Sequence, residues 1–115
     1  QTLEYLGCTA RWDITALENY QSPNNQANLE IFRILQEALH NATTKARATD
    51  LTVQATINPG GTYVLTVENS GGCSLSSATN QGHGIKNMQA RALRINAQLT
   101  LISQPTGARL TLNLP

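Results

Sequence analysis

The chain has 115 residues, 40% of them hydrophobic, and eight basic against seven acidic side chains give it a formal net charge of +1. This is the size of one domain with one core, residues 1–115, and a second domain would not fit. The near-neutral charge argues against a nucleic-acid partner, no apolar run approaches the roughly 18 residues of a membrane span, and no signal peptide opens the chain. Cys8 and Cys73 are expected to be free thiols, and no zinc-ligand spacing is present.

The first half of the sequence predicts a short strand and then a long helix. In "CTARWDI" (8–14), Trp12 and Ile14 are expected to face inward. The Pro-containing run "ENYQSPNNQ" predicts a loop, and Asn28 is the expected N-cap of the helix that follows. Apolar residues in this helix recur at steps of three and four, which predicts an apolar face made of Leu29, Phe32, Leu35, Leu39, Ala42 and Ala46.

Two hairpins and a second helix are predicted for the rest of the chain. "DLTVQATI" and "TYVLTVEN" alternate around the turn "NPGG", and "QLTLIS" and "ARLTLNLP" flank "QPTG". Between the hairpins lie a Ser-, Gly- and Asn-rich run (69–82) and a helix from about Ile85 to Ile95 that Asn96 ends. This order predicts an α+β fold: a two-layer α/β sandwich in which a mixed sheet of about five strands carries both helices on one face.

The segment "GHGIKNM" puts Gly82 and Gly84 around His83, directly before the second helix. A Gly-x-Gly turn at a helix start exposes backbone N–H groups to an anion, and the helix dipole favours negative charge there. Taken alone, the pattern is more often a plain loop-to-helix turn. Met88 and Trp12 are expected to belong to the core.

Four segments in fixed order, "ILQEALHNATTKARA", "VENSGG", "GHGIKNM" and "LTLNLP", resemble the GHKL (Bergerat-fold) ATP-binding domain, particularly the catalytic domain of sensor histidine kinases of the nitrate/nitrite-sensor type. The resemblance covers nearly the whole chain. Its N box, Glu-x-x-x-Asn, is matched by Glu37 and Asn41, which lie about one helical turn apart. The resemblance implies that Glu37 polarises the phosphoryl acceptor and that Asn41 is a ligand of Mg²⁺, an ion that prefers oxygen. Asn41 is therefore expected at a cleft and not in the core.

The same resemblance assigns nucleotide contacts to the second helix and the run before it. Gly82, His83 and Gly84 would form the G2 box, whose backbone N–H groups hold the phosphates of ATP. Asn87 would line the phosphate site, and the stretch 73–81 would be the ATP lid. For His83, an exposed and silent position in the turn is an equally good interpretation.

The segment after the first hairpin departs from the family pattern Asp-Asn-Gly-x-Gly. Asn69 stands where the family has the Asp that accepts a hydrogen bond from the adenine amino group, Gly71 stands at the first glycine, and Cys73 at the second. An Asn carbonyl still accepts that bond but carries no charge. Strand alternation opposes Glu68 at this position, and Ala108 replaces the usual Thr of the last hairpin. These departures bear on nucleotide affinity more than on the fold.

Three further polar residues are expected to face solvent. His40 is interpreted as a solvent-edge residue of the first helix, because the family carries its phosphorylated histidine on a separate upstream dimerisation helix. Arg91 and Arg94 are expected to form a solvated face of the second helix.

The resemblance implies the ATP-binding catalytic domain of a two-component sensor histidine kinase. It would use Mg²⁺ and ATP and deliver the γ-phosphoryl to a histidine on the dimerisation helix of its own protein, with a response regulator as the downstream partner. The domain is expected to be cytoplasmic and without membrane contact of its own, and its start at Gln1 indicates a piece of a longer protein. Two alternatives stay open: a degenerate domain that serves only as an interaction module, and an anti-sigma-factor-type kinase.

Overall fold

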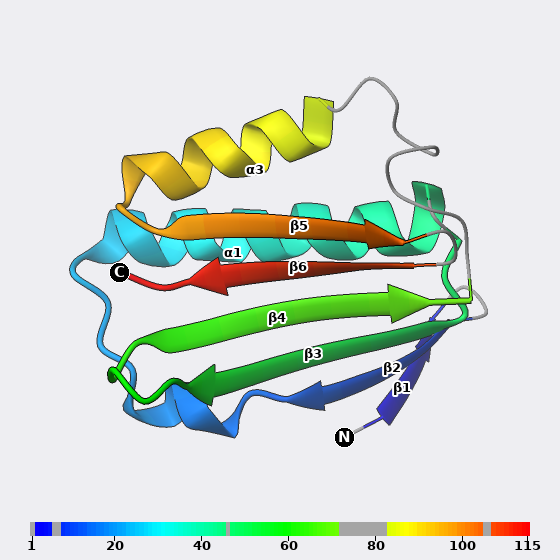
Figure 1. The fold of residues 1–115 in the computed structure, drawn as a ribbon, viewed down its shortest axis with the longest axis horizontal. Coiled ribbons are helices and arrows are strands. Elements are labelled where there is room, and N and C mark those ends of the chain that lie inside the picture. The colour runs from blue at the N-terminus through cyan, green and yellow to red at the C-terminus, as the bar shows by residue number, and fades with distance from the viewer. Residues whose placement is uncertain (1, 6–7, 46, 72–82, 105–106) are drawn as a thin grey trace.

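A computed structural model describes residues 2–5, 8–45, 47–71, 83–104 and 107–115. The described residues form two layers, a sheet and a layer of helices on one of its faces (Figure 1). In chain order the elements are β1 (Thr2–Tyr5), β2 (Cys8–Asp13), a short 3₁₀ helix η1 (Thr15–Asn19), α1 (Asn25–His40), a π-helical turn η2 (Asn41–Lys45), β3 (Asp50–Ile57), β4 (Tyr63–Ser70), α3 (His83–Arg94), β5 (Gln98–Gln104) and β6 (Gly107–Asn113).

The sheet has six strands in the order β1-β2-β3-β4-β6-β5. Strands β2 and β3 are parallel, and every other neighbouring pair is antiparallel. A parallel pair needs a long crossover, and α1 supplies it. The predicted fold class and both predicted hairpins are confirmed, and β1 is an additional edge strand that the sequence analysis did not find.

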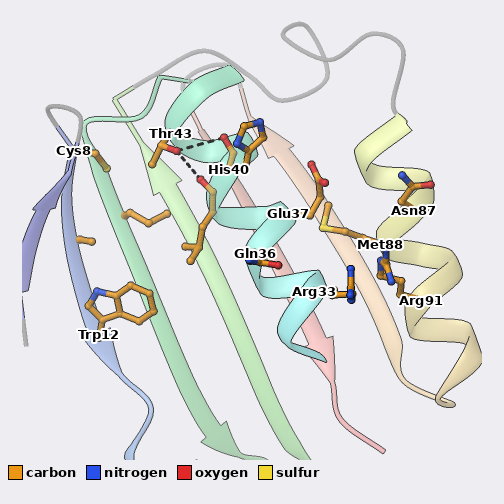
Figure 2. A pocket seen from close by; sticks show the side chains of 13 residues that line it. Cys8, Trp12, Arg33, Gln36, Glu37, His40, Thr43, Asn87, Met88 and Arg91 are labelled. Atoms are coloured by element: carbon orange, nitrogen blue, oxygen red, sulfur yellow. Dashed lines mark hydrogen bonds between the residues drawn. The ribbon is translucent and has the colours of Figure 1, made fainter. Parts of the chain in front are cut away.

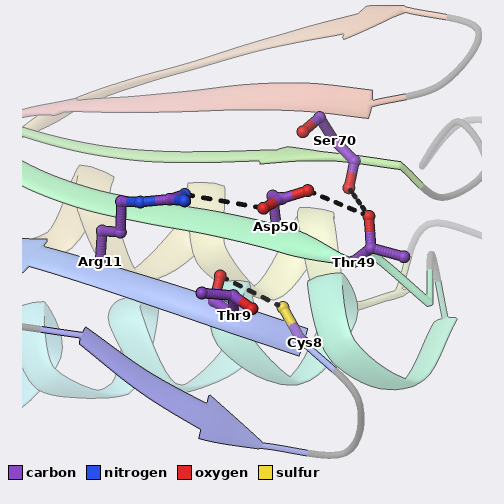
Figure 3. Close-up of polar contacts among 6 residues, drawn as sticks. All are labelled: Cys8, Thr9, Arg11, Thr49, Asp50 and Ser70. Atoms are coloured by element: carbon purple, nitrogen blue, oxygen red, sulfur yellow. Dashed lines mark hydrogen bonds and ion pairs between the residues drawn. The ribbon is translucent and has the colours of Figure 1, made fainter.

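The core lies between the sheet and the two long helices. Alternate residues of the central strands point toward the helices, as period-two patterning requires. These buried strand residues are Leu51, Val53, Ala55, Leu65, Val67, Leu110 and Leu112. The opposite face of the sheet is polar: Arg11 lies 3.6 Å from Asp50 there (Figure 3), and Arg109 lies 2.8 Å from Glu68.

The first helix begins four residues earlier than predicted. Its N-cap is Asn24, whose side-chain oxygen accepts a 2.8 Å hydrogen bond from the backbone N–H of Ala27. Asn28 is an interior residue of the helix. The run "NNQAN" offers several Asn residues that could cap a helix, so composition alone could not choose among them.

The predicted apolar face of α1 is wrong at its first two positions. Leu29 is 47% exposed and Phe32 is 57% exposed. The side that packs on the sheet carries Ala27, Glu30, Ile34 and Ala38. Because Glu30 lies among these buried residues, their positions do not form a continuous apolar pattern in the sequence.

Two further core expectations have different outcomes. Met88 is fully buried, as predicted, and Trp12 is half-buried and packs against the core. Ile14 is 44% exposed because β2 ends at Asp13, so strand alternation no longer determines its direction. The second helix ends close to the predicted point, and Asn96 there has a left-handed φ of 59°. Within the described residues, no helix is both long and apolar enough to cross a membrane.

Candidate functional site

A cavity of about 570 Å³ extends along α1 (Figure 2). On one side of α1, β2 contributes Cys8 and Trp12 to its wall; on the other side, α3 contributes Asn87 and Arg91. Burial raises the pKa of the Cys8 thiol, with a smaller contribution from Asp50, so this buried free thiol is protonated at neutral pH. The chemistry of the cavity therefore comes mainly from its polar residues on the two helices.

Glu37 and Asn87, predicted from separate motifs, line the same cavity. Glu37 is half-buried on α1, and Asn87 is exposed one turn into α3. The fully buried Met88 lines the wall beside them. His40 also lines the cavity and is exposed, as predicted for a solvent-edge residue.

Asn41 lies in the core and not at a cleft, which corrects the expectation. It is 1% exposed, and neither its side-chain oxygen nor its nitrogen has a hydrogen-bond partner among the described residues. The cause is helical geometry: a step of four residues turns about 40° around an α-helix. Asn41 is thereby rotated from the direction of Glu37 toward the buried side that carries Ile34 and Ala38.

Asn41 shares a small cavity of about 10 Å³ with Asn69, together with Ala38, Ala42, Val67, Met88, Ala108 and Leu110. Asn69 is 6% exposed, and its side-chain oxygen accepts a 2.6 Å hydrogen bond from the backbone N–H of Ala108. Only the carbonyl end of an amide can accept this bond, so the orientation of the Asn69 side chain is fixed. Glu68 points to the other face of the sheet, as alternation predicted, and pairs with Arg109.

Gly71 directly follows β4 and has a positive φ of 80°. A side chain there would run into the hydroxyl oxygen of Thr49. That hydroxyl lies 3.1 Å from a carboxylate oxygen of Asp50 and 3.5 Å from the carbonyl oxygen of Ser70, two acceptors for its single proton (Figure 3). Local packing and backbone conformation thus account for a glycine at this position, whatever it contacts.

The second helix begins within the predicted G2 box. His83 and Gly84 form its first turn. The first N–H groups of a helix have no partner inside the helix, so this end of α3 offers donors to an anion. Gly82, Cys73 and the predicted lid 73–81 lie outside the described residues.

The expectation that Arg91 and Arg94 form a solvated face is only partly correct. Arg94 is exposed, whereas Arg91 is half-buried, and both arginines pair with a buried carboxylate. Arg91 Nη1 lies 2.8 Å from one carboxylate oxygen of the buried Glu30, and Arg94 Nη1 lies 3.1 Å from the other. The hydrogen bond from Arg91 is the main cause that lowers the pKa of Glu30, although burial acts in the opposite direction. Sequence reasoning missed Glu30. Its position between Ala27 and Ile34, on the buried side of the helix, was the available signal, because a buried carboxylate needs a cation as partner.

No known protein-family model matches the chain. The sensor protein VraS of Staphylococcus aureus (strain COL) is 33% identical over 87 residues, which cover 74% of this chain and 25% of that protein. VraS of Staphylococcus saprophyticus is 30% identical over 101 residues, covering 86% of this chain and 28% of the relative. The chain thus spans about a quarter of the length of these curated relatives.

Solved structures share the fold at low sequence identity. The histidine kinase domain of the blue-light activated histidine kinase of Erythrobacter litoralis EL346 aligns with a TM-score of 0.70 and 16% identity, over 92% of this chain and 49% of that one. Full-length ShkA in complex with AMPPNP aligns with a TM-score of 0.66 and 14% identity, over 92% of this chain and 25% of that one.

Proposed function

We propose that this chain, which has the fold of histidine kinase catalytic domains and a sequence related to sensor proteins, is the ATP-binding catalytic domain of a sensor histidine kinase. It would act within a two-component system, at the cytoplasmic side. ATP would be its substrate, with Mg²⁺ bound to the phosphates. The phosphoryl acceptor would be a histidine on a dimerisation helix, and a response regulator would be the next partner.

The observation that carries the proposal is the meeting of Asn41 and Asn69 in one cavity. They come from separate motifs, on η2 and β4, and both are among the three polar or charged residues that are buried in the described part of the chain. Buried polar atoms normally have partners, yet both polar atoms of Asn41 are unpaired among the described residues. A ligand that enters between α1 and the sheet would supply those partners.

The remaining residues support a division of roles. The base would enter beside Asn69, and the phosphates would lie at the first turn of α3, where His83 and Gly84 present backbone N–H groups and the helix dipole favours negative charge. Glu37 faces the large cavity from α1, where it would orient and polarise the acceptor histidine. Gly71 would line the base, and Asn87 would lie beside the phosphates.

The donor set at Asn41 fits a magnesium ion that is held mainly by phosphates. Among the described residues, no cluster of three His, Cys, Asp or Glu side chains could hold a metal alone. Mg²⁺ typically takes one or two protein oxygens together with phosphates and waters, and would neutralise phosphate charge there. The 10 Å³ beside Asn41 has room for about one water at most, so nucleotide entry requires the elements around this cavity to move apart.

Calorimetric titration of ATP, with and without Mg²⁺, tests the proposal. Asn41→Asp keeps an oxygen ligand and should retain metal-dependent binding. Asn41→Ala should lose it while remaining folded, because the substitution removes polar atoms that have no partner among the described residues. ATP at a hundred times its Kd should stabilise the parent by about 2.7 kcal/mol in thermal unfolding.

Asn113→Ala is the matched control, since Asn113 lies on β6 and bonds Gln98 of the neighbouring strand. It should bind Mg²⁺ and ATP as the parent does. An unchanged affinity in Asn41→Ala removes Asn41 from the site. A parent chain that binds no nucleotide at millimolar concentration favours the interaction module instead.

A further inference from the structure

Glu30 is the one charged side chain that is buried among the described residues. It is 2% exposed, and each of its oxygens takes a separate arginine from α3. None of the roles proposed above for nucleotide binding uses it. A buried carboxylate with two cations is therefore a feature that the proposed function leaves unexplained.

Stability alone is a weak explanation for this triad. Taking charges out of water costs much of what their attraction returns, and well-packed apolar residues of similar size are often as stable or more so. Directional ion pairs can fix the relative position of two helices, which apolar packing alone does less well. The two bonds, from Arg91 at 2.8 Å and Arg94 at 3.1 Å, hold two points one turn apart on α3 against one point on α1.

The same two helices carry the candidate catalytic and phosphate-binding residues. They run side by side in opposite directions (Figure 1). Glu30 and Glu37 are two turns apart on α1, and Asn87 and Arg91 are one turn apart on α3, so each pair lies along one stripe of its helix. Glu37, Asn87 and Arg91 line one cavity (Figure 2). Sliding or rotating α3 on α1 would change the separation of Glu37 from the start of α3.

We propose that Glu30, Arg91 and Arg94 form a positioning triad that fixes the register of α3 on α1 and thereby the distance between Glu37 and the phosphate-binding end of α3. This proposal rests on the proposed function for its consequence in nucleotide binding. The register itself is a property of the folded chain without nucleotide. Arg91 and Arg94 are positioning residues in this scheme, and they need no contact with ATP.

The decisive variant is the double substitution Glu30→Leu with Arg91→Met. It removes the buried carboxylate and the half-buried arginine at similar side-chain volume, and leaves the exposed Arg94 to solvent. We expect a thermal midpoint at or above that of the parent. We also expect a Kd for Mg²⁺-ATP raised by at least about tenfold, because the phosphate-binding end of α3 would no longer be held in a fixed position relative to Asn41 and Asn69 before the nucleotide binds. If the triad served stability alone, a variant with an unchanged or higher thermal midpoint would keep the ATP affinity of the parent.

A second measurement follows the helices without nucleotide. Spin labels are attached after Phe32→Cys and Leu93→Cys, two positions that are 57% and 78% exposed, in a background with Cys8→Ala and Cys73→Ser. The distance distribution between the labels should be narrow with the triad intact and should shift or broaden in the double variant. Arg91→Lys keeps the charge but loses the planar fork, and should shift the distribution less.

Arg11→Met is the control, because it removes an Arg–carboxylate pair from the open face of the sheet. It should leave both the ATP affinity and the label distance unchanged.

An unchanged distance distribution in the double variant overturns the triad's role. If the parent binds no ATP, the proposed function fails and the label distances alone decide the register. If the double variant does not fold, Arg91→Lys with the same two measurements decides it.

Discussion

The side chain of Asn69 is held by the backbone of the neighbouring strand, and this bears on how the site would choose a nucleotide. Its oxygen already accepts from the N–H of Ala108. A carbonyl oxygen has a second lone pair, so one more hydrogen bond, from an adenine amino group, remains available. The amide supplies that bond without the charge that a carboxylate would bring.

Asn69→Asp should therefore tighten ATP by roughly threefold to tenfold, the difference between a neutral and a charged acceptor. GTP should not gain, since its ring carbonyl would face the carboxylate. Asn69→Ala should weaken ATP and leave GTP nearly unchanged. Competition of the two nucleotides against a fluorescent analogue measures these ratios. Equal ATP affinity in all three chains would show that Asn69 does not contact the base.

Glu30 makes stability depend on pH in a predictable direction. Its pKa is lowered in the folded chain from an ordinary value of 4.5, so its contribution is complete above that value and is lost as the pH falls through the lower, folded pKa. Glu30→Gln removes the buried charge that accepts from the half-buried Arg91 and the exposed Arg94, and should cost on the order of 2 kcal/mol at neutral pH, the contribution of hydrogen bonds to a charged group.

Urea unfolding of the parent and of Glu30→Gln from pH 7 to pH 3 tests this dependence. The difference in the free energy of unfolding should stay constant down to about pH 5, since both states of the parent are ionised there. Below pH 4.5 the two curves should converge. A difference that does not change with pH would contradict an ion pair as its source.

At the scale of single elements, periodicity predicted α1, α3 and every strand of the described sheet except β1, but not how α1 is oriented. Leu29 and Phe32 satisfy an amphipathic pattern and are nevertheless exposed, whereas the buried Glu30 breaks the pattern. Apolar periodicity places Glu30 at the surface. Its burial depends on the two arginine partners on α3, which a search along α1 alone does not include. Candidate site residues were likewise proposed from motifs, while the depth of Asn41 depends on the orientation of α1, which only the structure supplies.

The start of α1 gives a direct test of the corrected boundary. Asn24→Ala removes the acceptor for the Ala27 N–H and should cost about 1 kcal/mol of stability. Asn28→Ala replaces an exposed interior Asn with the best helix former, and should be neutral or stabilise the chain by a few tenths of a kcal/mol. Urea midpoints of the two variants should therefore move in different directions from the parent. A larger loss for Asn28→Ala would restore the boundary expected from sequence.

At the scale of the whole molecule, the two faces of the sheet have separate tasks. The described candidate residues Glu37, Asn41 and Asn69 all belong to the helix side. The outer face carries exposed ion pairs such as Arg11 with Asp50, which contribute little to stability. Changes on that outer face should leave nucleotide binding intact, so surface substitutions for solubility belong there.

The parallel pairing of β2 with β3 has a consequence for the order in which the chain folds. Hairpins β3–β4 and β5–β6 close over short turns, whereas β2 meets β3 only after α1 has crossed the sheet, and such long-range closure is slow. We expect Val67→Ala in β4 to slow folding, and Ala10→Gly in β2 mainly to speed unfolding, in stopped-flow chevron plots.

Comparable folding-rate losses in the two variants would contradict this order. Because α1 carries Glu37 and ends at His40, directly before Asn41, the proposed nucleotide site would be completed after the rate-limiting barrier. ATP would then slow unfolding and leave the folding rate unchanged, so that a bound nucleotide prolongs the lifetime of the native state without helping the chain to reach it.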